Sequence, residues 1–132
     1  MLMRLLHGAA LSLFAILAVT TAAAAAKCNV QSVRLCDGCN TSIRWDVVQA
    51  PSGPAAEHSF CQNEWHSLNG LGKFVVVQPP HLGTVRFHDY LIAYRGEKLG
   101  QDTMVIRFNW LSASNRPMSA QVTYNINVVS SM

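Results

Sequence analysis

The clearest strand pattern in the chain lies near its C-terminus and reads Gln121-Val122-Thr123-Tyr124-Asn125-Ile126-Asn127-Val128. Polar and apolar residues alternate along this segment without a break. Successive side chains of a β-strand point to opposite faces of a sheet, so this alternation predicts a strand with one face in a core and the other in solvent.

The same two-residue period recurs towards the N-terminus. It predicts strands at about 42–48, 83–87, 90–94 and 103–110, separated by turn residues. The run from Phe74 to Val77 is continuously apolar, which favours a strand buried on both faces. Residues 57–72 show no clear period, and an irregular loop or a short helix near 59–65 is expected there.

Several short strands, each with one apolar face, are typical of two sheets packed face to face. No sustained amphipathic helix competes with this interpretation. The expected fold class is therefore all-β, an immunoglobulin-like β-sandwich, with a β-barrel as the alternative. The expected extent of this single domain is residues 27–132.

The first 26 residues have the pattern of a secretory signal peptide. A charge at Arg4 precedes an apolar run over 11–19, and Ala24-Ala25-Ala26 fits the small-residue cleavage rule. The apolar run is short for the roughly 20 residues that cross a bilayer. We expect cleavage before Lys27, no membrane span afterwards, and a periplasmic or secreted protein.

The four cysteines, Cys28, Cys36, Cys39 and Cys61, all follow the expected cleavage point. An even number of cysteines in an exported chain predicts two disulfides, for which three pairings are open. A Cys36–Cys39 bond would staple a tight turn and leave Cys28 to pair with Cys61. The alternatives join Cys28 to Cys36 or to Cys39.

Two other uses of these cysteines are alternatives to structural disulfides. A thioredoxin-like redox site needs its C-x-x-C at a helix N-terminus, but a strand-like pattern follows Cys39. A zinc site would combine Cys36, Cys39 and Cys61 with His58 or His66. Zinc ligation requires reduced thiols, and export argues against these.

Residues 74–129 carry an ordered set of features: Pro80, Gly83-Thr84-Val85, Tyr94, Gly100-Gln101-Asp102 and the alternating C-terminal strand. In this order they resemble the bacterial immunoglobulin-like and cadherin-like domains of exported proteins. The resemblance implies turns at Gly83 and Gly100, a hydrogen bond between Asp102 and the loop backbone, and a Tyr94 side chain that fills the edge between the sheets.

No catalytic motif stands out, and we expect no enzyme activity and no cofactor. The sequence holds no G-x-S-x-G motif. Its 10 basic and 7 acidic residues give a net charge of +3 with the basic residues scattered, which does not indicate nucleic-acid binding.

Two sets of residues remain as candidate sites. Trp65 and His66 lie in the segment without a clear period, where an exposed tryptophan would form a contact surface for a protein or a glycan. His81 and His88 flank the strand at 83–87 and are candidate copper or zinc ligands, with Met104 or Met118 as a third.

The sequence thus favours an exported, non-catalytic interaction or structural module, with a protein or glycan partner in the envelope. Its binding surface is expected to be loops or an exposed sheet edge. The alternative is a small periplasmic metal carrier that uses His81, His88 and a methionine.

Overall fold

The structure is a computed structural model that describes residues 27–65 and 72–132. This part of the chain forms one short 3₁₀ helix and eight strands: β1 (Cys28–Val30), β2 (Asn40–Val48), η1 (Pro54–His58), β3 (Cys61–Glu64), β4 (Gly72–Gln78), β5 (Gly83–His88), β6 (Leu91–Gly96), β7 (Gly100–Leu111) and β8 (Pro117–Val129). It contains no helix with the length and apolar character needed to cross a bilayer.

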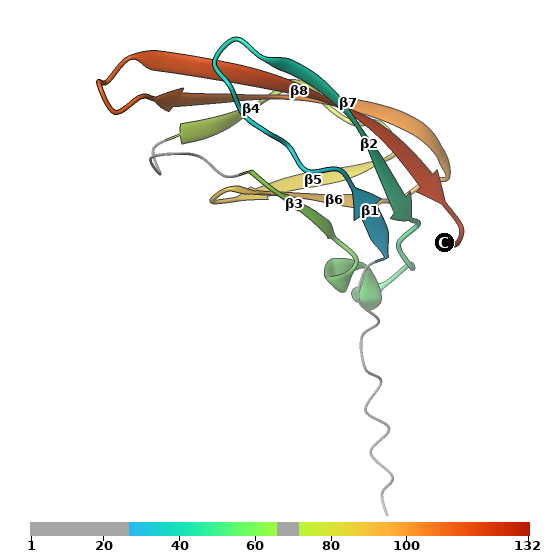
Figure 1. The fold of residues 1–132 in the computed structure, drawn as a ribbon. Coiled ribbons are helices and arrows are strands. Elements are labelled where there is room, and N and C mark those ends of the chain that lie inside the picture. The colour runs from blue at the N-terminus through green and yellow to red at the C-terminus, as the bar shows by residue number, and fades with distance from the viewer. Residues whose placement is uncertain (1–26, 66–71) are drawn as a thin grey trace, which may run out of the picture.

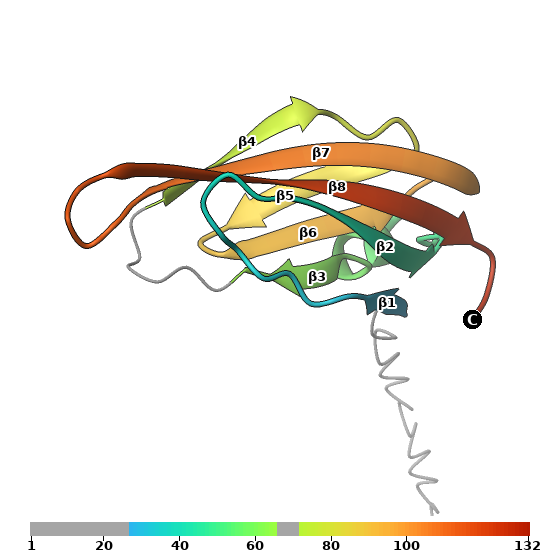
Figure 2. The ribbon, with the colours of Figure 1, turned by 45° about the horizontal axis from the view of Figure 1, so that its top comes forward.

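The strands form two sheets that face each other (Figures 1 and 2). The larger sheet has the order β1-β2-β8-β7-β4, and the smaller has the order β3-β6-β5. Strand β2 runs parallel to β8, whereas the other neighbouring pairs are antiparallel. The expectation of an all-β fold with two packed sheets is confirmed.

The core lies between the sheets and is built by the alternation seen in the sequence. In β8, Val122, Tyr124, Ile126 and Val128 are buried, and every second residue of β7 packs beside them. At the centre, the indole of Trp45 contacts two phenol rings, with centroid distances of 5.9 Å to Tyr94 and 5.1 Å to Tyr124.

The segment at 57–72 differs from the expected loop or helix. Helix η1 ends at His58, before the predicted position, and Cys61–Glu64 forms strand β3. Cys61 and Asn63 occupy the inward positions of β3. Because Asn63 is polar, the apolar two-residue period that indicates a strand is missing. The rest of this segment, 66–71, lies outside the described residues.

The burial of strand β4 differs from the burial on both faces that its apolar run predicts. Its apolar run is not buried on both faces, because β4 is the last strand of the larger sheet. Val76 and Val77 retain 38% and 47% of their surface. An apolar run indicates a strand, but the position of that strand within a sheet depends on pairing with distant segments.

Candidate functional site

The sandwich has two sides that differ in how the sheets meet. We call the side formed by the edges of β1 and β3 the closed side, because the Cys28–Cys61 disulfide joins these two strands. We call the side formed by the edges of β4 and β5 the open side. There the chain passes from one sheet to the other through residues 79–82.

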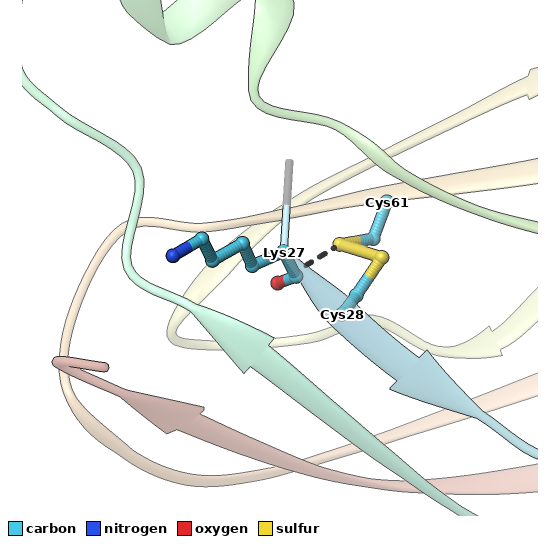
Figure 3. The surroundings of a disulfide bond; sticks show 3 residues. All are labelled: Lys27, Cys28 and Cys61. Atoms are coloured by element: carbon cyan, nitrogen blue, oxygen red, sulfur yellow. Dashed lines mark hydrogen bonds between the residues drawn. A yellow bond between two sulfur atoms is a disulfide. The ribbon is translucent and has the colours of Figure 1, made fainter. Parts of the chain in front are cut away.

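The closed side is shown in Figure 3. The Cα atoms of Cys28 and Cys61 lie 6.0 Å apart, and the Cys61 sulfur lies 3.7 Å from the carbonyl oxygen of Lys27. Cys61 is buried, so the bond ties the first strand of the larger sheet into the core of the smaller one. This is the pairing left when Cys36 bonds Cys39, one of the three that the sequence left open.

The Cys36–Cys39 disulfide closes the tight turn expected from the sequence. Gly38, at φ +74°, adopts a conformation that favours glycine. The turn docks on β8, where the Gly38 amide donates to the Ser119 carbonyl at 2.7 Å and the Ser119 amide donates to the Asp37 carboxylate at 3.0 Å.

The two disulfides use all four cysteines of the chain. The zinc alternative needs three of these sulfurs as thiolates around one ion, and the structure instead places them in two separate bonds. The C-x-x-C precedes strand β2 rather than a helix, so the thioredoxin-like arrangement is also not formed.

The open side carries apolar side chains at the surface. The rings of Phe74 in β4 and Phe87 in β5 stack across the gap between the sheets, with centroids 5.2 Å apart. Phe87 is nevertheless 37% exposed, and Val76 and Val77 lie on the adjacent edge. Lys73 supplies the single charge within β4.

One buried carboxylate holds the crossover of the open side in place. Asp102 in β7 accepts hydrogen bonds from the backbone amides of His81 at 2.9 Å and Leu82 at 2.7 Å. The hydroxyl of Tyr94 in β6 donates to the same carboxylate at 3.2 Å. Asp102 therefore connects both sheets and the 79–82 crossover, and the expected roles of Asp102 and Tyr94 are confirmed.

We call these hydrogen bonds the Asp102 clamp. They also set the ionisation of the Asp102 carboxylate and the Tyr94 phenol. Burial by itself would raise the pKa of Asp102, but the amides of His81, Leu82 and Thr103 outweigh it and hold that pKa below its ordinary value of 3.8. Burial, together with the negative charge of Asp102, raises the pKa of Tyr94. The carboxylate is thus charged and the phenol neutral near neutral pH.

Gly83 is needed at the same end of the sandwich, for a reason that its sequence context does not reveal. Its φ is not in the left-handed region. A Cβ atom at this position would instead collide with the Arg95 carbonyl oxygen and the Tyr94 ring. Glycine allows β5 to approach β6 closely over the Tyr94 side chain.

The expectation that Trp65 forms an exposed contact surface is wrong. Its side chain is fully buried at 0% exposure. The indole N–H donates to Tyr124 Oη at 2.6 Å and to Asn63 Oδ1 at 3.1 Å, and the Tyr124 hydroxyl donates to Asn63 Oδ1. Because these groups satisfy one another inside the core, Trp65 is a packing residue; His66 lies outside the described residues.

The structure does not bring His81 and His88 together. His81 precedes β5 by two residues and His88 is its last residue. A strand rises about 3.3 Å per residue, so the five steps from Gly83 to His88 alone span roughly 17 Å. Met104 is fully buried. One metal ion therefore cannot bind the two histidines, and within 27–65 and 72–132 no three His, Cys, Asp or Glu side chains form a metal-binding group.

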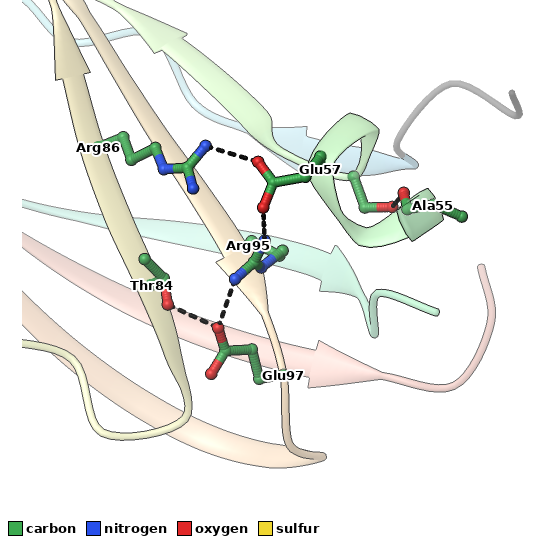
Figure 4. Close-up of polar contacts among 7 residues, drawn as sticks. Ala55, Glu57, Thr84, Arg86, Arg95 and Glu97 are labelled. Carbon is green, nitrogen blue, oxygen red and sulfur yellow. Dashed lines mark hydrogen bonds and ion pairs between the residues drawn. The ribbon is translucent and has the colours of Figure 1, made fainter. Parts of the chain in front are cut away.

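The outer face of the smaller sheet holds a charged cluster (Figure 4). The guanidinium groups of Arg86 and Arg95 lie 4.5 and 4.9 Å from the ring centroid of Phe60. Glu57 pairs with both arginines, and Arg95 also pairs with Glu97 at 3.0 Å. Hydrogen bonding to Arg86 lowers the pKa of Glu57. These charges compensate one another and hold η1 against β5 and β6.

A hollow of about 700 Å³ lies where β4 meets the β7–β8 hairpin. Its apolar lining includes Val75, Leu111 and Met118, and Lys73 stands among its polar residues. The sequence did not predict this hollow, because its lining comes from three strands and from Asp37 of the Cys36–Cys39 turn, which become neighbours only through the sheet order.

The two packed sheets, with their closed side and their open side, define the class of protein. The chain forms a two-sheet β domain that is held by disulfides. No family model, curated protein or solved structure matches the chain.

Proposed function

We propose that this chain is an exported, non-catalytic interaction or structural module with an immunoglobulin-like fold, and that it binds its partner protein through the open side. Export is inferred from the signal-peptide pattern over 1–26 and from four cysteines placed in disulfides.

The strand order supports the immunoglobulin-like part of the proposal. Numbered A to G in chain order, strands β2 to β8 place C, F and G side by side in one sheet and B, E and D in the other. These are the neighbours found in immunoglobulin sandwiches. Here strand A pairs in parallel with G.

The observation that carries the proposal is the contrast between the two sides. Exposed sheet edges with apolar side chains invite pairing with other chains, and proteins usually protect them with charges or cover them. The closed side ends in the three-residue strand β1, which a disulfide ties to β3, whereas β4 leaves Val76 and Val77 exposed. Such an edge is suited to binding an added strand.

Site-specific photo-crosslinking in the producing cell tests the proposal. A photoreactive phenylalanine analogue is placed at Val77 on the open side, and in a control variant at the exposed Gln62 of β3 on the closed side. We expect adducts of discrete mass from position 77 and none from position 62. N-terminal sequencing of the exported protein should begin at Lys27.

Absence of adducts at position 77, or equal adducts at both positions, would overturn the interaction role. Mature protein found in the cytosol with reduced cysteines would overturn the export role. The two measurements are independent, so each part of the proposal is tested separately.

A further inference from the structure

We propose that the hollow beside the β7–β8 hairpin is a binding site for a single-chain fatty acid, with the carboxylate at Lys73 and Arg107 and the apolar chain along β7. The proposed protein-binding function uses the exposed edge of β4, whereas this site uses outward-facing side chains of β4, β7 and β8. The inference goes beyond that function and does not depend on it.

The hollow lies mainly on the outer face of the larger sheet, away from the smaller sheet. In β7, Phe108 and Trp110 are buried at inward positions, so the alternating residues Asn109 and Leu111 point outward. Lys73 of β4 pairs with Asn109 and therefore shares the outer face. Asn109, Leu111 and Lys73 all line the hollow.

The dimensions of the hollow suit one acyl chain. Strand β7 lies between β4 and β8, so the hollow spans two strand spacings, about 10 Å in all. Along β7, the four steps from Arg107 to Leu111 cover about 13 Å. The volume of about 700 Å³ falls within the range of small-molecule sites.

The end of the hollow near the hairpin is apolar. Leu111 is 40% exposed and pairs with Pro117 at the start of β8. Met118 is half-buried beside them, and its flexible thioether side chain can adapt to an apolar ligand. Val75 supplies apolar surface on β4. An acyl chain placed here would remove this surface from water, which favours binding.

Two cations without counter-ions mark the other end. Arg107 pairs with Val75, which lines the hollow, and Lys73 is its diagonal neighbour, at about 7–8 Å in such a sheet. Both side chains are exposed. Within 27–65 and 72–132, neither forms an ion pair. One carboxylate can accept hydrogen bonds from an ammonium and a guanidinium group together.

The remaining charges near this face are already paired. Asp37 borders the hollow on its β8 side, where its carboxylate accepts a hydrogen bond from the Ser119 amide and lies 3.8 Å from the Arg116 guanidinium. Arg44 of β2 pairs with Asp46 at 2.9 Å. The unpaired charges beside the hollow are therefore positive, which favours an anionic head group over a neutral or cationic one.

Nuclear magnetic resonance titration of the exported protein, with both disulfides formed, tests the proposal. The probes are octanoate, octanol and octylammonium, which share one chain length and differ in the charge of the head group. Octanoate should shift backbone amides at 72–75, 109–111 and 118–119, with a Kd on the order of 100 μM. Octanol should bind at least about tenfold more weakly, because it lacks the charge-assisted hydrogen bonds, and octylammonium should not bind.

Substitutions separate the head-group contacts from the chain contacts. Lys73→Gln and Arg107→Gln should each weaken octanoate binding about tenfold and leave octanol binding unchanged. Leu111→Thr should weaken both ligands about threefold, because it removes apolar contact area. Arg44→Gln is the matched control: it removes a positive charge from the same face of the sheet, away from the hollow, and should leave octanoate binding unchanged. The spectrum of each variant shows directly whether it is folded.

Four outcomes would overturn the proposal: no octanoate shifts at the hollow, octanol binding as tight as octanoate binding, equal losses in Arg107→Gln and Arg44→Gln, or binding of octyl phosphate without binding of octanoate. A peptide that shifts the same amides while octanoate does not would also overturn it and would identify a peptide site. Val77 does not line the hollow, so crosslinking from position 77 tests the protein-binding function separately.

Discussion

The closed and open sides of the sandwich connect the same two sheets by different chemistry. On the closed side a covalent bond joins Cys28 of β1 to Cys61 of β3. On the open side the Asp102 carboxylate holds the 79–82 crossover and Tyr94 through hydrogen bonds. The first connection is sensitive to reduction and the second to acid. The open side also carries the exposed apolar side chains of Val76, Val77 and Phe87.

The difference shows how a small domain can combine a stable core with an exposed edge. A disulfide restricts the unfolded chain, whereas a buried carboxylate contributes through contacts made only in the folded state. With the two sheets connected at both sides, the outer edge of β4 can remain uncovered while Phe74 of the same strand packs against the core.

The largest loss of unfolding free energy is expected from removing the disulfide of the closed side. The variant with Cys28→Ala and Cys61→Ala should lose about 4 kcal/mol of unfolding free energy, because this disulfide closes a loop with a sequence separation of 33. Urea unfolding at neutral pH measures the loss. A loss below that of the shorter Cys36–Cys39 loop would contradict the leading role given to the closed side.

The next largest loss of unfolding free energy is expected from a change in the Asp102 clamp on the open side. Asp102→Asn should lose about 2–3 kcal/mol at pH 7, because a charged acceptor of several buried donors is replaced. The folded-state pKa of Asp102 is lowered, so its contribution is complete above the ordinary value of 3.8 and is lost as the pH falls through the lowered value.

Urea midpoints measured at pH 7 and at pH 3 test this assignment. The wild type should lose stability on acidification, and Asp102→Asn should show a smaller loss. Asp89→Asn, at an exposed turn residue, is the control and should keep the full acid sensitivity. Equal pH dependence in wild type and Asp102→Asn would refute the clamp.

A smaller loss of unfolding free energy is expected from removing the Cys36–Cys39 disulfide, which closes a turn and does not connect the two sheets. The variant with Cys36→Ala and Cys39→Ala should lose about 2 kcal/mol, because its loop has a sequence separation of only 3. Thermal unfolding of the two double variants side by side gives the ranking. The Gly38 contact with Ser119 should persist, since it is made by backbone atoms.

The smallest effect is expected at the exposed edge itself. Val77→Thr should change monomer stability by about 0.5 kcal/mol or less, because Val77 contributes little to the core. The same substitution at the fully buried Val47 should cost about 1–3 kcal/mol, because it buries a hydroxyl group. Similar losses at both positions, measured by urea unfolding, would show that β4 is not an uncovered edge.

The alternating segments of β7 and β8 were predictable because burial on one face imposes a two-residue period that is local in sequence. Strand β3 escaped prediction because Asn63 occupies an inward position, and its suitability depends on Trp65 and Tyr124 from other parts of the fold. The same network explains why Trp65 gave a false indication of a contact surface.

By itself the sequence determined the strand-forming alternation, the presence of paired cysteines and the polar residues able to hold turns, since these follow from side-chain spacing and chemistry. Only the tertiary structure decided that Cys28 bonds Cys61, that Asp102 reaches the crossover, and that β4 stands at an edge. Those features depend on which distant segments become neighbours, and strand order is set by the packing of the whole chain rather than by any local pattern.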